Sequence, residues 1–535
     1  MTITAAPRPE KTSPAMSGMA VMVAVCFALP GFYVIWRFLN SSSRSIDLIF
    51  EQRAMEPLWR TVQLAVLVSI SSAILGTFLA WACIKTDIPW SRFWKIVVPL
   101  PLVFPSFVGA ASLLSGLTSG GILHDLLSFF GIELSFRLQG LTGSWFVLTL
   151  FTYPYVYLPV AGRIMKLPTS LEESARVLGN KSGKAFFRII TPQLMPSILA
   201  GSLLVFLYTL SDFGAVHLMR YETLTQTIFR TRLFDQERSF AMALILLILA
   251  FVVITAERKI SRKATVFPSA IDRPPMIISL GKWRWPAVTV CFLVVGLALI
   301  SPLVSMADWG LISQISGRST RELQLNWDSI INPVWSTLWV SVITALIAVA
   351  VLLPVAYLQT RYKSPIGDAT NALIITGFAI PGLVIALSLI FWTLHASPFD
   401  FLIGSLPLLI FAYIVHFGAQ ALRTSQIAVS SVPPPLEDAA RLLGAKKIRK
   451  LTTVDIPIMA PGLAAGAGLV MLSTMKELPA TLLASPIGFR TLAVEIWDTY
   501  EASYLAETAI LSLILVILSG ILSWGLIVRR NSIST

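Results

Sequence analysis

The sequence predicts an all-α integral membrane protein with twelve transmembrane helices, arranged as two tandem repeats of six. Three observations lead to this fold class: an apolar composition, a series of apolar runs of membrane-spanning length, and an internal repeat. Of the 535 residues, 55% are hydrophobic and only 13% are charged, whereas a soluble globular domain has about 25% charged residues. This composition excludes a soluble enzyme, a disordered scaffold and a secreted disulfide-rich module.

Twelve apolar runs are long enough to cross a bilayer, for which a helix needs about 20 residues. They lie near residues 15–37, 58–84, 96–118, 142–162, 196–219, 239–256, 285–306, 334–359, 370–394, 402–422, 461–484 and 503–527. We therefore divide the chain into a first six-helix half at 1–256, a linker at 257–284 and a second six-helix half at 285–535.

The net charge of +13 follows from where the basic residues lie. Most of the 41 Lys and Arg residues fall in alternate loops, starting with the amino terminus and ending with the carboxyl tail. Cytoplasmic loops of membrane proteins are enriched in Lys and Arg, so we expect both termini to lie in the cytoplasm. This distribution accounts for the basic composition without nucleic-acid binding, and the lipid bilayer is the expected surrounding.

The internal repeat is clearest in a short polar segment that occurs once in each half. Leu171–Gly179 aligns without a gap on Leu436–Gly444, 265 positions later, and Asp212 aligns on Glu477 in the same register. Because each half holds an even number of spans, the halves are expected to share one orientation about an axis along the membrane normal.

Each polar segment has the pattern of a short helix on the cytoplasmic side. Its apolar residues recur at helical spacing, and a glycine, Gly179 or Gly444, follows where a helix can end in the left-handed conformation. We expect two such helices, one per half, to form docking sites for a two-fold symmetric cytoplasmic partner. The alternative is a pair of ordinary interfacial loops.

At these residues the chain resembles the permeases of ABC transporters, whose cytoplasmic loop reads Glu-Ala-Ala, three residues, then Gly. Both copies depart from this pattern by one conservative replacement, Ser174 in the first and Asp438 in the second. The resemblance covers nearly the whole chain and implies the fold of a type I ABC importer permease with its two halves fused. The residues that it assigns to ATPase coupling are Glu172, Glu173, Ala175 and Gly179 in the first half and Glu437, Asp438, Ala440 and Gly444 in the second.

Within this family, the segments Leu210–Val216, Met475–Leu483 and Gly488–Ala493 resemble those of the ferric-iron permeases. The resemblance implies a binding-protein-dependent importer in a bacterial inner (plasma) membrane, moving ferric iron inward by alternating access. Its implied partners are two copies of a cytoplasmic ABC ATPase and an extracytoplasmic, ferric-iron-binding protein. Fused permeases for thiamine, phosphonate or another small solute are an alternative. An ion-coupled secondary transporter is another, although it would not need the paired docking segments.

The chain lacks the residues for ATP hydrolysis. A phosphate-binding loop requires Gly, four residues, then Gly-Lys-Ser or Gly-Lys-Thr, and the nearest string, Gly179–Ala185, is one residue short and ends in Ala. We therefore expect no enzymatic activity and no cofactor on this chain, with ATP and Mg²⁺ bound by the partner ATPase.

Two acidic residues, Asp212 and Glu477, fall in expected spans and occupy equivalent positions of the repeat. An ionised carboxylate inside a membrane is costly, so it marks either a transport pathway or a paired structural charge. Carboxylate oxygens suit a hard cation such as ferric iron, which makes both residues candidates for metal binding in the translocation pathway. Alternatively, Asp212 is a hydrogen-bonded helix-end residue, and Glu477 is neutralised by the adjacent Lys476.

Overall fold

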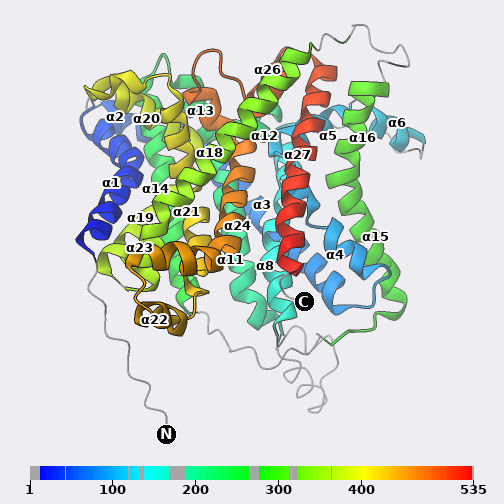
Figure 1. Ribbon diagram of the computed structural model, residues 1–535. Helices are drawn as coiled ribbons and strands as arrows, with labels where there is room; N and C mark the ends of the chain where they lie inside the picture. The colour runs from blue at the N-terminus through cyan, green and yellow to red at the C-terminus, as the bar shows by residue number, and fades with distance from the viewer. Residues whose placement is uncertain are drawn as a thin grey trace. The chain divides into compact units, whose positions relative to one another are not determined.

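The computed structural model describes residues 13–41, 44–118, 121–129, 131, 138–167, 188, 190–263, 276–312, 315, 323, 326–362 and 364–532. These residues form a succession of helices (Figure 1). Within them, ten helices are long and apolar enough to cross a membrane, or up to twelve if each of two bent helix pairs counts as one span. The predicted all-α membrane fold is confirmed.

The two bent pairs replace spans that the sequence predicts as single helices. The span expected near 96–118 is divided into Ser91–Val103 and Ser106–Gly116, which meet at 99°, and the one near 370–394 into Pro365–Ala379 and Gly382–His395, at 106°. A proline, Pro105 or Pro381, lies at each break. Proline has no backbone N–H and disfavours helical geometry in the residue before it, so each span bends where its proline begins a new helix.

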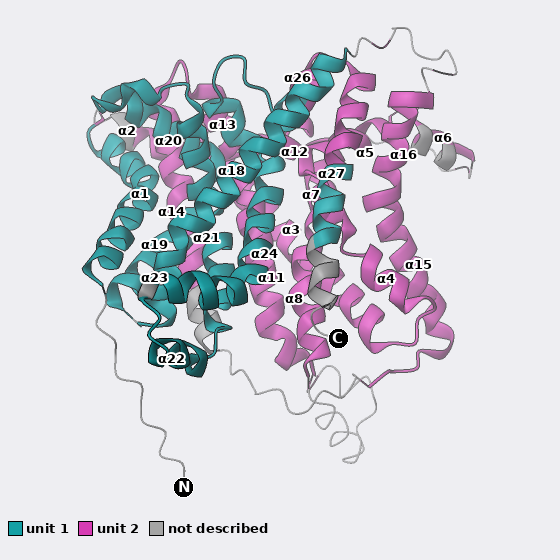
Figure 2. Cartoon of the chain, in the orientation of Figure 1, with its two compact units in different colours: residues 1–40, 326–495, 517–535 teal, residues 41–325, 496–516 magenta. Residues whose placement is uncertain are grey.

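The chain folds into two compact units that do not coincide with the two halves of the sequence (Figure 2). Unit 1 contains residues 1–40, 326–495 and 517–535, and unit 2 contains residues 41–325 and 496–516. Each unit thus combines most of one half with a segment of the other.

Unit 1 is built around three helices of the second half. Helix α18 (Trp327–Thr360) packs on α21 (Leu406–Ser430) and α24 (Ile456–Met475), and these two also pack on each other. The other helices of the unit are α1 (Pro14–Leu39), α19 (Pro365–Ala379), α20 (Gly382–His395), α22 (Pro434–Leu442), α23 (Lys447–Lys450) and α25 (Pro479–Ala484).

Unit 2 repeats this core with helices of the first half. Helix α3 (Gln52–Lys85) packs on α8 (Pro154–Met165) and α11 (Thr191–Ser211), which also pack on each other. The other helices of the unit are α2 (Arg44–Phe50), α4 (Ser91–Val97), α5 (Ser106–Gly116), α6 (Ile122–Phe129), α7 (Gly140–Thr152), α12 (Gly214–Leu218), α13 (Leu224–Thr231), α14 (Gln236–Lys263), α15 (Arg284–Val295) and α16 (Ser301–Ala307). Two further helices, α26 (Leu492–Glu501) and α27 (Leu505–Ser532), each have residues assigned to both units.

The first span of each half packs in the unit formed by the other half. Helix α1 contacts α19 and α20 of unit 1, and α16 contacts α5 of unit 2. This exchange ties the two halves together, because neither unit is complete without a helix from the other half.

One hydrogen-bonded threonine occurs at the same place in both units. In unit 2, the Thr61 hydroxyl donates to the carbonyl of Pro57 at 2.6 Å and accepts the Leu224 N–H at 2.9 Å. In unit 1, the Thr337 hydroxyl donates to the carbonyl four residues earlier and accepts the Leu492 N–H at 2.8 Å. Each threonine therefore binds the first turn of a short helix, α13 or α26, to a long core helix, and the repeat in sequence is also a repeat in hydrogen bonding.

Replacing Thr61 by Val should leave the buried Leu224 N–H without its acceptor. We expect the free energy of unfolding to fall by about 1–3 kcal/mol, the cost of an unsatisfied buried donor. Thermal unfolding of the purified chain in detergent measures the change, with Thr61→Ser, which keeps the hydroxyl, as the control. Equal stability of the Val and Ser variants would show that this hydrogen bond does not stabilise the fold.

Candidate functional site

Helix α22, the second copy of the repeated polar segment, has residues at both ends that favour a helix. Pro434 and Pro435 occupy its first two positions, where the missing N–H groups have no helical partner in any case. Glu437 lies in its first turn and Arg441 in its last, so each charge complements the helix dipole.

Gly444 ends this helix in the left-handed conformation that the sequence predicts, with a φ of 79°. Its N–H donates to the carbonyl of Arg441 at 2.9 Å, and the N–H of Ala445 donates to that of Ala440 at 3.0 Å. These two bonds form a Schellman motif, which satisfies carbonyls at the helix end and reverses the chain.

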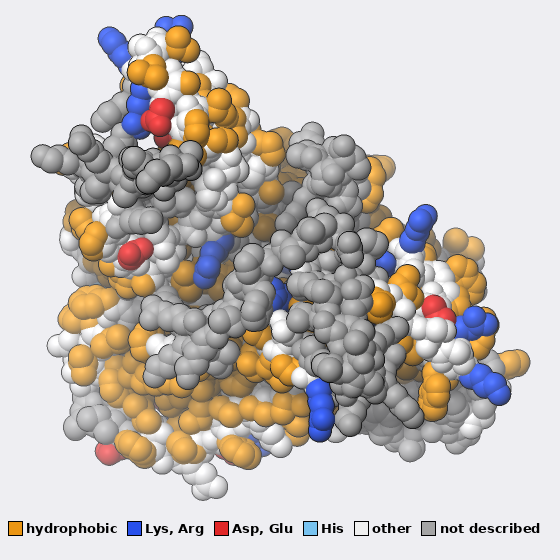
Figure 3. Space-filling view, turned by 90° about the horizontal axis from the view of Figure 1, so that it is seen from below, with side chains coloured by type: hydrophobic (Ala, Val, Ile, Leu, Met, Phe, Trp, Pro, Cys, Tyr) orange, Lys and Arg blue, Asp and Glu red, His pale blue; other side chains and the backbone are white. Residues whose placement is uncertain are grey.

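The helix turns a polar residue inward and apolar residues outward. Glu437 and Ala440 are buried, whereas Leu442 and Leu443 are 89% and 88% exposed. Figure 3 views the molecule from the end that carries α22 and α23, and shows apolar side chains at the surface together with projecting Lys and Arg side chains. Leu442 and Leu443 thus add two adjacent apolar side chains to the surface at this end of α22.

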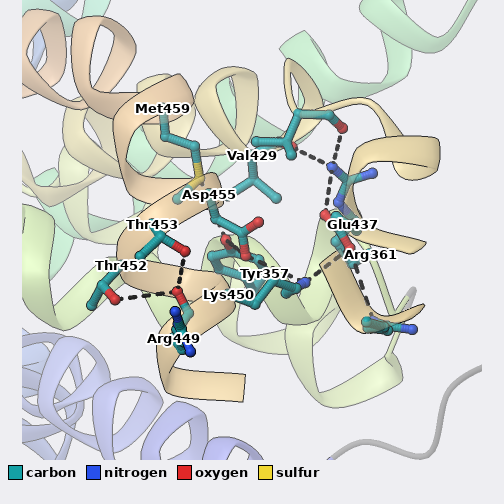
Figure 4. A network of polar contacts seen from close by, with 12 residues as sticks. Tyr357, Arg361, Val429, Glu437, Arg449, Lys450, Thr452, Thr453, Asp455 and Met459 are labelled. Atoms are coloured by element: carbon teal, nitrogen blue, oxygen red, sulfur yellow. Dashed lines mark hydrogen bonds and ion pairs between the residues drawn. The ribbon is translucent and has the colours of Figure 1, made fainter. Parts of the chain in front are cut away.

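The buried Glu437 carboxylate is held by two cations from other elements (Figure 4). Arg361, which follows α18, lies 3.1 Å from its Oε1 atom, and Lys450 of α23 lies 3.1 Å from Oε2. Arg361 also donates to the backbone carbonyls of Val429 and Val432, just before the helix. Helix α22 is thereby held at its base by paired charges and hydrogen bonds.

The same network continues into the long core helices of unit 1. Lys450 lies 3.3 Å from Oδ2 of Asp455, and the Tyr357 hydroxyl of α18 donates to that oxygen at 3.2 Å. Asp455 ends a π-helical turn, Leu451–Asp455, that leads directly into α24. The network therefore links α22 to α18 and α24 through charged and hydrogen-bonded groups.

Sequence reasoning identified only part of this site. It selected Glu437, but not Arg361, Lys450, Asp455 or Tyr357, since nothing in their local pattern indicates that they meet. The equivalent first-half residues Glu172, Glu173, Ala175 and Gly179 lie outside the described residues. Asp438, also selected, is mostly exposed on the helix surface.

Asp212 lies at the break between α11 and α12 rather than in the middle of a span. It is the C-cap residue directly after α11, and it is buried. Its Oδ1 atom accepts the N–H groups of Ala215 and Val216 at 3.0 and 3.3 Å, and its Oδ2 atom accepts the hydroxyl of Ser106, the first residue of α5. Asp212 thus caps α12 and fastens it to the second arm of the bent pair.

Glu477 holds the equivalent position between α24 and α25. Its Oε1 atom accepts the N–H of Ala480 at 3.1 Å, and its carbonyl accepts the Thr481 hydroxyl at 2.7 Å. Its Oε2 atom lies 3.9 Å from Nε2 of His416 on α21, a residue that sequence reasoning did not select.

Among the described residues there is no group of three or more His, Cys, Asp or Glu side chains that could hold a metal ion. Asp212 and Glu477 belong to different units, and each forms its own contacts. The hydrogen bonds explain how each carboxylate is tolerated in an apolar surrounding, and the role of these acids in a translocation pathway stays a prediction.

The sequence profile of the family "Binding-protein-dependent transport system inner membrane component" matches residues 66–266 and again 352–532, once in each half. The chain belongs to this family. As a permease of the inner membrane, it is a transport protein and not an enzyme.

The permease is 29% identical over 513 residues to the Fe(3+)-transport system permease protein FbpB 2 of Haemophilus influenzae, covering 94% of this chain and 96% of that protein. It is also 30% identical over 166 residues to the molybdenum transport system permease protein ModB of Escherichia coli, covering 30% of this chain and 71% of that protein. A probable sulfate transport system permease protein, cysT of Marchantia polymorpha, is 27% identical over 197 residues, or 36% of this chain and 66% of that protein. The similarity to FbpB 2 spans both halves of the permease, as expected for a fused arrangement.

Replacing Arg361 by Met should loosen the base of α22, because Glu437 loses one cation and two carbonyls lose a charged donor. Hydrogen bonds to charged groups contribute about 1.5–3 kcal/mol each, and we expect a loss of this order in the free energy of unfolding. Denaturation in detergent measures it. Arg449→Met, which removes an exposed arginine beside Lys450, is the control. Equal effects of the two substitutions would contradict a stabilising role for the network.

Replacing Gly444 by Ala should strain the end of α22. No atom lies within 4 Å of the added methyl group, so the cost comes from the left-handed backbone alone, about 1–2 kcal/mol. This corresponds to roughly 5–30-fold faster amide hydrogen exchange in residues 434–445. Gly444→Asn should have a smaller effect because Asn tolerates this conformation. Unchanged exchange in the Ala variant would contradict the assigned helix end.

Proposed function

We propose that this chain is the fused transmembrane permease of an ABC importer that carries ferric iron across a bacterial inner membrane. The observation that carries the proposal is the similarity to the Fe(3+)-transport permease FbpB 2, which extends over nearly the whole of both chains. A fused permease offers two halves, and therefore two docking helices, to a pair of ATPase subunits.

The proposed topology places both termini and both docking helices in the cytoplasm. It rests on the concentration of Lys and Arg in alternate loops. The partners would be two copies of a cytoplasmic ABC ATPase, which binds ATP and Mg²⁺, and an extracytoplasmic protein that delivers ferric iron.

The contacts of α22 provide a route from the ATPase to the membrane helices. Closure of the ATPases would move α22, whose exposed Leu442 and Leu443 form the docking surface. Because Glu437 is bound to Arg361 and Lys450, the motion would pass to α18 and α24 rather than be lost in a flexible loop. Such rigid-body movement suits alternating access.

A permease for an oxyanion is the second candidate. Its support is the similarity to molybdenum and sulfate transport permeases, which covers only about a third of this chain in each case. The Glu477 carboxylate, beside an imidazole at a helix break, suits a cation better than an oxyanion, and this favours ferric iron.

The direct test is uptake by proteoliposomes that contain this chain, its ATPase and its binding protein. We expect ATP-dependent accumulation of ⁵⁵Fe³⁺, with no accumulation when the ATPase is omitted. Accumulation of radiolabelled molybdate and of radiolabelled sulfate is measured in the same proteoliposomes for comparison. Uptake of an oxyanion without uptake of iron would overturn the substrate assignment and leave the permease assignment intact.

The purified chain by itself should hydrolyse no ATP, because its sequence holds no complete phosphate-binding loop. The measurement is phosphate release by the detergent-solubilised chain before and after addition of the ATPase subunit. Hydrolysis that follows this chain through successive purification steps, with no ATPase subunit detectable by mass spectrometry, would contradict the proposed division of labour.

A further inference from the structure

The two acidic positions of the repeat have different surroundings, and the difference begins at the proline-marked breaks. Pro105 precedes Ser106 at the start of α5, and Pro381 precedes Gly382 at the start of α20. Because each proline precedes the second arm of the bent span in its half, Ser106 and Gly382 are equivalent residues. Each one contacts the acid of its own unit, so the repeat pairs Ser106 with Asp212 and Gly382 with Glu477.

In unit 2, both carboxylate oxygens of Asp212 accept hydrogen bonds. Ser106 donates its hydroxyl to one oxygen of Asp212, and two backbone N–H groups bind the other oxygen. Both oxygens therefore accept hydrogen bonds from donors of the protein. A cation would have to displace these donors before it could bind.

In unit 1, Gly382 has no side chain, and the carboxylate of Glu477 occupies the space that a side chain at this position would fill. A Cβ atom at Gly382 would lie 2.5 Å from Oε1 of Glu477 and 3.4 Å from Nε2 of His416. The glycine thus lets the Glu477 carboxylate approach the start of α20, next to an imidazole. The equivalent place in unit 2 is occupied by a serine side chain.

The carboxylate and the imidazole are placed as two ligands of one ion. Oε2 of Glu477 and Nε2 of His416 are 3.9 Å apart, too far for a hydrogen bond, and each side chain is only 11% exposed. Metal bonds to imidazole nitrogen and carboxylate oxygen measure about 2.0–2.2 Å in zinc sites, so one ion between these atoms could reach both with little movement. The ring centroids of Phe417 and Phe378 lie 4.4 and 6.4 Å from the centroid of the His416 imidazole, and these rings limit its reorientation.

We propose that Glu477 and His416, brought together by Gly382, form a binding site in unit 1 for the transported metal cation, whereas Asp212 and Ser106 form a structural pair. The proposal rests on the proposed function for the identity of the cation, a hard or borderline transition-metal ion such as ferric iron. Imidazole and carboxylate are both common ligands of iron in proteins.

The small number of protein ligands makes such a site suited to passage rather than to storage. It supplies two protein ligands, so water or the delivered ion's own ligands would complete the coordination. A transport site has to bind weakly enough to release its ion.

The test is equilibrium binding of ⁵⁵Fe³⁺, supplied as its nitrilotriacetate complex, to the full chain in detergent after washing with chelator. His416→Gln and Glu477→Gln should each weaken binding by about tenfold or more. His395→Gln, which changes another histidine of unit 1, should bind as the wild type does. Thermal unfolding of each variant separates lost binding from lost folding.

Transferring the unit 2 pair of side chains into unit 1 gives a variant that is expected to fold and yet not to bind iron. Gly382→Ser combined with Glu477→Asp rebuilds the unit 2 pair in unit 1, with a shorter acid and a hydroxyl to hold it. We expect wild-type thermal stability and the same loss of iron binding as in His416→Gln. Wild-type binding by this double variant would overturn the proposal.

Two further outcomes would also overturn it. One is no binding of iron to the wild-type chain, and the other is binding that is lost in Asp212→Asn but kept in His416→Gln. Because binding is measured without ATPase or binding protein, the result is independent of the uptake assay. Iron uptake with unaltered binding in His416→Gln refutes this site alone, whereas binding without uptake refutes the proposed function alone.

Discussion

A helix that ends inside a membrane leaves backbone N–H and C=O groups that water cannot reach, and these groups must find partners within the protein. This constraint applies wherever the permease interrupts a span. After α11 and after α24 the chain restarts as a short helix, and in both places an acidic side chain accepts N–H groups of the new helix. The first residues of α5 and α20, Ser106 and Gly382, follow the bends and lie next to these acids. Carboxylates that are costly in an apolar surrounding are therefore retained because they satisfy backbone groups that would be costlier unpaired.

The repeat preserves this solution while changing its chemistry. Thr61 and Thr337 make the same two hydrogen bonds in their respective units, so the backbone framework of the halves is closely alike. At the acidic positions the halves differ, because a serine with a short acid in one corresponds to a glycine with a long acid in the other. The combined size of the two side chains is nearly conserved, which keeps the break intact. The polar group that faces the acid is free to change, from a hydroxyl to an imidazole.

Helix α22 is held by a different kind of interaction, because its buried acid is paired with cations and not with the N–H groups of a helix. Its apolar Leu442 and Leu443 remain exposed, and its Glu437 is buried among cations. Truncating one member of a buried ionic network is strongly destabilising, since it leaves the other charges unpaired. The network therefore holds α22 in one orientation relative to α18 and α24, and a rigid attachment of this kind can carry a displacement into the membrane helices.

The sequence by itself determined the features that depend on neighbouring residues in the chain. Apolar run length predicted the spans, the repeat predicted two related halves, and Gly444 marked a helix end, because hydropathy and backbone conformation are local properties. It did not predict that two spans break, because Pro105 and Pro381 lie inside apolar runs that read as continuous. Tertiary structure alone decided that the first span of each half packs in the other half's unit. It also decided that Glu437 meets Arg361 and Lys450, and that Glu477 lies beside His416. Those contacts join residues far apart in the chain, and they depend on how helices pack and rotate against one another, which no local pattern specifies.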